Sequence, residues 1–262
     1  MKKIVLFSLV ALFTGSMLKA QDGENDLKNF RFGLKFAPTI NWTRPDDKKI
    51  VKDGGSLGVK YGLMMEFRLN SVASFATGIE GSHLGMKVSY ADSAVYRVLD
   101  DAYAKIGDTS GTGTTKSSYL LNSRAMRTVY ITVPLTLKLK TKDIGGMTYF
   151  GLFGGDLNFR AGSKATDKVT NLQVANGTSF DPTKVDNTKD MNLMTVNLNA
   201  GGGIEYNVSG STSFVASIHY NRGFLSTTKT TSDFLAKGKY STAGYSQKAF
   251  CDGIVISLGV LF

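Results

Sequence analysis

The chain has 262 residues, 42% of them hydrophobic, and its 31 Lys and Arg residues outnumber 21 Asp and Glu residues, giving a formal net charge of +10. The 29 glycines together with only 4 prolines argue against a collagen-like or disordered chain. A single cysteine, Cys251, excludes an intramolecular disulfide framework and a cysteine-cluster metal site, and two histidines leave little for a histidine metal site.

Residues 1–20 have the pattern of a secretory signal peptide. Lys2 and Lys3 form a positive start, residues 4–13 are an apolar run, and Ala20 fits the last position before cleavage. The run is shorter than the ~20 residues that a membrane-spanning helix needs. We therefore expect export, and no later segment is apolar enough to predict a membrane helix.

The rest of the chain alternates apolar and polar residues with a period of two, which predicts β-strands. About eight strands are expected, near residues 30–42, 59–69, 75–80, 129–140, 150–160, 194–208, 214–221 and 253–262. The alternation blurs near residues 81–85. In the fifth strand, Phe150 and Leu152 form the apolar set, followed by Leu157 and Phe159 in the opposite parity. Most of these strands are longer than the ~5–6 residues common in soluble sheets and suit tilted membrane strands of ~9–11 residues.

The connections between the expected strands alternate in length. Short ones lie at residues 70–71, 141–146 and 209–211, and long ones at residues 43–56, 91–124, 161–190 and 225–247. Short periplasmic turns with long external loops are typical of outer-membrane barrels, whereas a soluble barrel has no reason to sort its loops by end.

The predicted fold is therefore all-β: a closed antiparallel up-and-down transmembrane barrel of about eight strands over residues 29–262. Residues 21–28 would form a short periplasmic segment before it. Aromatic residues are expected in two girdles at the membrane interfaces. The inner girdle comprises Phe30, Phe67, Phe75, Tyr206, Phe214 and Phe262, and the outer one Trp42, Tyr130, Phe159, Tyr220 and Phe250.

Charged residues on the polar face of each strand would point into the barrel. They are Arg31, Lys35, Lys60, Glu66, Arg68, Glu80, Lys138, Lys140, Asp156, Arg160, Glu205 and His219. An eight-stranded barrel is only wide enough inside for side chains, and buried charges must be paired. A structural ion network is the expected outcome, with a selective conduit as the alternative. Inward glycines such as Gly33, Gly62 and Gly203 are expected to make room for these side chains.

No residue is predicted to be catalytic, cofactor-binding or metal-binding, and no cofactor is expected. His219, with Ser217 and Asn221 on its face, is expected to be a hydrogen-bonded lumen histidine, and His83 a polar residue at the rim. Cys251 is expected at the outer rim as an inert thiol. The Gly201-Gly202-Gly203 run lies inside a strand with no lysine after it, which excludes a phosphate loop.

Three expectations concern partners and modification. The basic residues are spread over loops and lumen without a basic stripe, which favours attraction to lipopolysaccharide phosphates and outer-membrane lipids over nucleic acid. The long loops are candidate sites for protein partners. Asp92-Ser93-Ala94 matches the Asp-Ser/Thr-apolar pattern of O-glycosylation in some Gram-negative bacteria.

Four segments in order resemble the PorT-like outer-membrane β-barrel family: residues 129–140 (VYITVPLTLKLK), 199–209 (NAGGGIEYNVS), 219–224 (HYNRGF) and 256–262 (ISLGVLF). The resemblance covers about residues 29–262 and implies an outer-membrane barrel of about eight strands. It implies recognition by the barrel-assembly machinery through the C-terminal strand ending at Phe262, and it brings no catalytic residues. One branch of the family, PorT itself, is implied in protein secretion.

The expected function is that of a non-enzymatic outer-membrane barrel whose external loops bind partners or shield the surface. A narrow channel, a PorT-type role in secretion and a lipid-modifying barrel enzyme using His219 or His83 remain alternatives. Arg at the lipid-facing positions Leu198 or Ile131 should cost ~2–4 kcal/mol, while the inward neighbours Asn199 and Thr132 should tolerate polar substitution better.

Overall fold

The computed structural model describes residues 29–48, 50–90, 119–171, 179–180, 185–210, 212–230 and 247–262. The predicted signal peptide (residues 1–20), the segment 21–28 and the Asp92-Ser93-Ala94 pattern lie outside these ranges and stay predictions. No helix in the described part of the chain is long and apolar enough to cross a membrane.

Eight long strands form a closed antiparallel barrel, which confirms the predicted fold class. They are β1 (Phe30–Pro45), β3 (Gly55–Arg68), β4 (Ala73–Tyr90), β5 (Tyr119–Lys140), β6 (Met147–Asn171), β9 (Met194–Ser209), β10 (Thr212–Gly223) and β11 (Ala249–Leu261). Each of these strands pairs with its neighbour in the chain, and β1 closes the barrel against β11, from Gly33 opposite Leu261 to Pro45 opposite Ala249.

Three short strands and one 3-10 turn extend the barrel at one end. β2 (Ile50–Lys52) pairs with β4, while β7 (Ser179–Phe180) and β8 (Val185–Asp186) both pair with β6. The turn η2 (Thr188–Asp190) follows β8.

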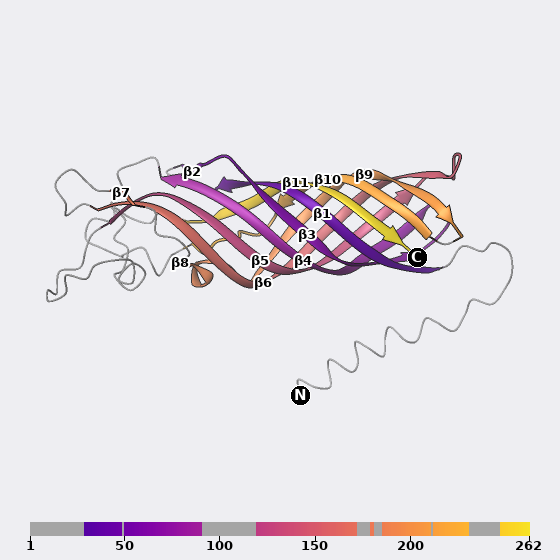
Figure 1. The fold of residues 1–262 in the computed structure, drawn as a ribbon, viewed down its shortest axis with the longest axis horizontal. Helices are drawn as coiled ribbons and strands as arrows, with labels where there is room; N and C mark the ends of the chain where they lie inside the picture. Colours follow the sequence, from indigo (N-terminus) through magenta and orange to yellow (C-terminus); the bar gives the residue numbers. More distant parts are fainter. Residues whose placement is uncertain are drawn as a thin grey trace, which may run out of the picture.

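The two ends of the barrel differ. The connections at residues 69–72, 141–146 and 210–211 are short and lie at the same end as Phe262, here called the inner end. Gly145 and Gly146 adopt positive φ values of 67° and 84°, the left-handed conformation that a tight turn demands of glycine. β2 and β7 lie at the opposite, outer end (Figure 1).

Along the inner part of the barrel the apolar residues face outward and the polar residues face the lumen, as predicted. Leu34, Leu63 and Ile131 are 60%, 55% and 53% exposed, whereas Lys60, Glu80 and other charged residues on the opposite faces are buried. We call this outward apolar surface the apolar band. A soluble protein would invert this arrangement, so the band is a surface for lipid.

The strands reach further at the outer end than predicted. β5 begins at Tyr119 and β6 continues to Asn171, inside segments expected to be loops, and β1 runs on to Pro45. The alternation of β4 also continues through the region where it was expected to blur, with Ser82, Leu84, Met86 and Val88 all buried.

On β4 the reason for the difference is a reversal of polarity. Beyond His83 the inward residues of β4 become apolar while the outward ones become polar, so the pattern shifts by one residue although the strand is regular. A prediction that assigns one apolar face to the whole strand therefore treats this reversal as an irregularity.

Three residues correct the predicted faces. Phe150 and Leu152, expected on the apolar outer face, point into the lumen and are buried. Tyr130, expected in the outer aromatic girdle, is 1% exposed and lies inside the barrel. Trp42 and Tyr220, both predicted in the outer girdle, lie side by side with stacked rings 6.1 Å apart.

Inward glycines allow neighbouring strands to approach closely. A Cβ at Gly203 would lie 2.3 Å from the Ala216 carbonyl oxygen and 2.6 Å from the Phe150 ring, and one at Gly201 would lie 2.3 Å from the Ile218 carbonyl oxygen. Real Cβ atoms cannot come so close to a backbone oxygen. The sequence therefore needs glycine here because of the neighbouring backbone, in addition to any room for lumen side chains.

The apolar band can be tested with one charge at two heights on the same strand face. Leu135 lies near the middle of the outward band of β5, and Ser123 lies on the same face beyond its outer edge. Leu135→Arg should lower the free energy of unfolding in lipid vesicles by ~2–4 kcal/mol, whereas Ser123→Arg should cost at most ~1 kcal/mol.

Reversible denaturant unfolding in vesicles measures both variants. Equal costs would contradict the assignment of the membrane region. Asn199 and Thr132 face the lumen as expected, but both are buried and hydrogen-bonded, which makes an outward control preferable.

Candidate functional site: the filled lumen

The inner end of the lumen holds a cluster of five charged side chains, here called the inner ion cluster. It consists of Arg31, Glu66, Lys138, Lys140 and Glu205. Glu66 pairs with Arg31 and Lys138, each at 2.9 Å, and also with Lys140. Glu205 pairs with Lys140 at 2.8 Å and with Arg31. Both carboxylates are thereby neutralised.

Apolar side chains pack beside this cluster. Phe150 and Leu152 from β6 contact Val215 and Leu261, and Met64 packs against them. The ammonium group of Lys138 lies 4.9 Å from the centre of the Phe150 ring, a cation–π distance. This packing explains why two large apolar residues of β6 face the lumen. They fill the space beside the ions and exclude water from it.

A second polar layer crosses the middle of the lumen. The Lys60 ammonium donates to Asp156 at 2.6 Å, and the Asn199 and Asn221 amides donate to the same carboxylate at 2.6 Å and 3.1 Å. Asn221 also donates to Asn199, and Asn197 donates to Asn221. We call these five residues the central polar layer.

Two further interactions join the same level of the lumen. Lys35 pairs with Glu80 at 2.7 Å. On the β4–β5–β6 side, the hydroxyls of Ser82 and Thr132 are 2.8 Å apart, and Thr132 donates to Asn158 at 2.8 Å. The predicted ion network is thus confirmed, and its partners come from strands far apart in the sequence.

A small cavity of about 70 Å³ lies between the inner ion cluster and the central polar layer. His219 and Ser257 line it, and the His219 Nδ1 and Ser257 Oγ atoms have no hydrogen-bond partner among the described residues. The expected hydrogen-bonded role of His219 is therefore wrong at Nδ1, although its inward position is confirmed. The cavity is lined by apolar side chains such as Met64 and Phe150 as well as by polar ones, and it has room for a few water molecules but not for a drug-sized ligand.

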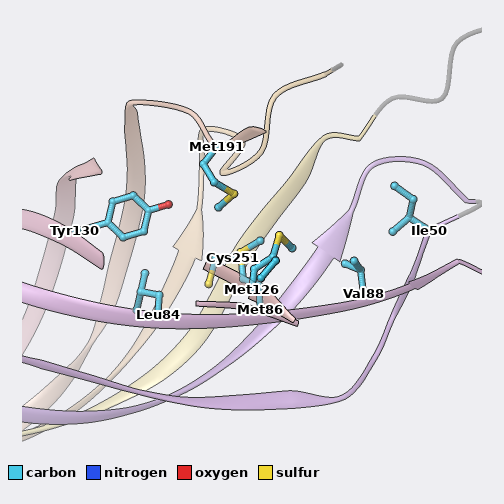
Figure 2. Packing of buried hydrophobic residues seen from close by; sticks show 9 residues of the cluster. Ile50, Leu84, Met86, Val88, Met126, Tyr130, Met191 and Cys251 are labelled. Carbon is cyan, nitrogen blue, oxygen red and sulfur yellow. The ribbon is translucent and has the colours of Figure 1, made fainter. Parts of the chain in front are cut away.

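The outer part of the lumen is filled by apolar side chains, here called the apolar cap (Figure 2). The cap comprises Ile50, Leu84, Met86, Val88, Met126, Tyr130, Ala165, Met191 and Cys251. Its members come from β2, β4, β5, β6, β11 and the segment before β9. Cys251, predicted at the outer rim, is 3% exposed and belongs to this interior cluster, so its predicted position was wrong.

The cap includes one residue that comes from outside the barrel wall. Met191 lies in the segment between η2 and β9, is fully buried, and points down into the cluster (Figure 2). Arg160 donates to the carbonyl oxygens of Thr188 and Met191, and Asn192 donates to the carbonyl oxygens of Ser226 and Thr228. These bonds fix the segment across the mouth of the barrel.

A further group of paired charges borders the cap on its outer side. Arg124 donates to both carboxylate oxygens of Asp167, at 2.7 Å and 2.8 Å, and lies 3.4 Å from Asp190. Two parallel hydrogen bonds from a planar guanidinium hold their partner more rigidly than a lysine could. The lumen is thus filled in three stages: ions, a polar layer, and an apolar cap with its own ion cluster.

The lumen carboxylates described above are paired with cations, and among the described residues no group of three or more His, Cys, Asp or Glu side chains could hold a metal ion. His83, predicted at the rim, faces outward with its Nε2 3.3 Å from the Tyr61 hydroxyl. The cap residues Met86, Met126 and Met191 escaped sequence analysis because apolar residues were assumed to face lipid.

These features together define the class: a closed barrel with a lipid-facing apolar band, a filled polar lumen and short turns at one end is an outer-membrane β-barrel protein. Residues 19–229 match the family model described as outer membrane protein beta-barrel domain, and the chain belongs to this family. Its membership places it in the outer membrane. No curated protein sequence matches the chain.

Three solved structures resemble the barrel. Neisserial surface protein A is 9% identical, with 89% of this chain and 96% of that chain covered and a TM-score of 0.39. Ail of Yersinia pestis is 12% identical, with 90% and 100% covered and a TM-score of 0.32. OprG from Pseudomonas aeruginosa is 10% identical, with 91% and 99% covered and a TM-score of 0.38. At these values the likeness carries no argument about function.

The central polar layer predicts a strong dependence of stability on the pairing of Lys60 with Asp156. Lys60→Met leaves a buried carboxylate without its cation and should lower the free energy of unfolding by about 3–5 kcal/mol. Asp156→Asn should cost a comparable amount, because it leaves the buried ammonium unpaired. The double variant should recover much of either loss, since it removes both charges together.

A double-mutant cycle from unfolding in vesicles measures this coupling. Strictly additive losses would contradict the ion pair as the organising contact of the layer.

Proposed function

We propose that this outer-membrane barrel is neither an enzyme nor a channel, and that it acts through its outer rim and the segments beyond it. The observation that carries the proposal is the filled lumen. A solute would have to pass the inner ion cluster, the central polar layer and the apolar cap, and each of these is held together by buried contacts. A porin offers solutes a water-filled channel, whereas side chains fill the lumen of this barrel.

The absence of an enzymatic role is supported by chemistry rather than by comparison. A barrel hydrolase or acyltransferase needs a nucleophile or base within reach of lipid or solvent. His219 is enclosed in the lumen, and the ring of His83, which is exposed, lies within hydrogen-bond distance of the Tyr61 hydroxyl. In the part of the chain that the structure describes, neither histidine is hydrogen-bonded to a carboxylate that could orient it.

The electrical behaviour of the barrel tests the proposal. The refolded protein in planar bilayers should show no stable conductance steps, while a large porin in the same bilayer serves as the positive control. Clear and long-lived openings of the unmodified protein would contradict the closed lumen and favour the channel alternative. Loss of a lipid-modifying activity in His219→Ala would favour the enzyme alternative.

The motifs that resemble PorT-like proteins support a finer proposal, a role in protein secretion across the outer membrane. In that case a strain lacking this protein should lose a defined set of extracellular proteins, detected by mass spectrometry of the culture medium, and a plasmid copy should restore them. An unchanged set of secreted proteins would leave surface interaction as the proposed role and would exclude the PorT-type one.

Assembly and lipid contacts complete the proposal. β11 ends the barrel, and Phe262 packs its ring 5.8 Å from that of Phe32 on the outer surface at the inner end. This exposed terminal aromatic residue is the feature through which we propose recognition by the barrel-assembly machinery. Outer-membrane lipids and lipopolysaccharide are the proposed environment of the apolar band and of the charges above it.

A further inference from the structure

The sheet opens locally on the outside of the barrel between β3 and β4. The β3–β4 ladder ends where Val59 pairs with His83. Beyond it this edge of β4 is held by a hydrogen bond from the Asp53 backbone N–H to the Lys87 carbonyl oxygen, and by the pairing of Val88 with Lys52 of β2. A recess of about 280 Å³ lies at this break. Its lining includes Leu57, Val59 and Val129, which belong to the outer edge of the apolar band.

Two basic side chains, Arg127 and Lys87, lie at this recess or just beyond it toward the outer end of the barrel. Arg127 lines it and is exposed, and its strand neighbour Val129 is the last residue of the band on β5. Lys87 of β4 lies two residues beyond Gly85, which pairs with Arg127. Arg127 on β5 and Lys87 on β4 are the first outward-facing Lys or Arg residues beyond the apolar band on their strands.

A third cation adds to the positive charge at the recess. Lys164 of β6 pairs directly with Arg127 across the ladder, and both side chains are exposed. Like charges directly opposite each other in a sheet are destabilising unless an anion lies between them. Asp186 of β8 lies opposite Lys164 in the ladder on its other side, and its negative charge attracts that lysine. Among the described residues no acid forms an ion pair with Lys87 or Arg127.

We propose that this recess is a binding site for a phosphorylated lipid of the outer leaflet. Its acyl chains would lie over Leu57, Val59 and Val129, and its phosphate would lie between Arg127 and Lys87. The height of the two cations, at the edge of the apolar band, is the height of lipid headgroups. A guanidinium binds a phosphate through two parallel hydrogen bonds. The apolar lining, continuous with the band, selects a lipid over a free phosphate ion.

The site can be tested by native mass spectrometry of the full mature protein released from detergent micelles. The probe is diphosphoryl lipid A, compared with the same lipid after removal of its phosphates. Arg127→Gln should weaken binding of the phosphorylated lipid about fivefold, and the double variant Lys87→Gln/Arg127→Gln about 25-fold. The matched control is Arg222→Gln, an exposed outward cation on β10 at the same end of the barrel, which should bind as the unmodified protein does.

Three results would overturn the site. Equal loss in Arg222→Gln and Arg127→Gln would show diffuse surface attraction. Equal binding of the dephosphorylated lipid would show that the cations take no part. Displacement of the lipid by an equal concentration of inorganic phosphate would show a site for free anions. The heat-induced gel shift of each variant checks that it is folded, and the outcome is independent of whether the lumen conducts.

Discussion

The narrowness of an eight-stranded closed barrel is the constraint on which the rest of this structure depends. Its interior has room for side chains and little else, so every charge that faces inward is removed from water and must find a partner there. The inner ion cluster and the Lys60–Asp156 pair satisfy this demand with contacts between strands on different sides of the barrel. The same contacts fill the lumen, and this filling is what favours a role at the outer surface over one in transport.

A second consequence is that the face of the strands that carries polar residues changes along the barrel axis. It depends on whether lipid or water surrounds the barrel at that height. Within the membrane, lipid covers the outside and the lumen carries the polar groups. Above the membrane, water covers the outside, so Lys87, Arg127 and Lys164 face outward and the apolar cap fills the interior. The barrel is therefore a membrane protein over its inner part and resembles a soluble barrel over its outer part. The transition between the two is where outward cations meet the edge of the apolar band.

This reversal also determines what could be predicted from the sequence. Where one rule holds throughout, as in β9, the alternation predicted the correct faces and nearly the correct bounds, and the short turns fixed the order. Where polarity reverses, the same rule failed: Tyr130 and Cys251 were placed at the rim, and β4 was expected to lose its pattern. Phe150 and Leu152 failed for another reason, since they are lumen residues in the membrane region that pack around ions. The pairing of Lys60 with Asp156, 96 residues away, depends on the order of strands around the barrel. The capping role of Met191 depends on a segment with no periodic pattern.

The native cysteine offers the most direct measurement of the closed lumen, because Cys251 is the one thiol of the chain and lies in the apolar cap. The refolded protein in lipid vesicles would be treated with a small hydrophilic thiol reagent, and the labelling rate compared with that of the unfolded chain in denaturant. A sealed lumen predicts labelling slower by orders of magnitude in the folded barrel, limited by its opening. Labelling of the folded barrel at the rate of the unfolded chain would mean that water reaches the cap freely, and would contradict the account of a filled and closed lumen.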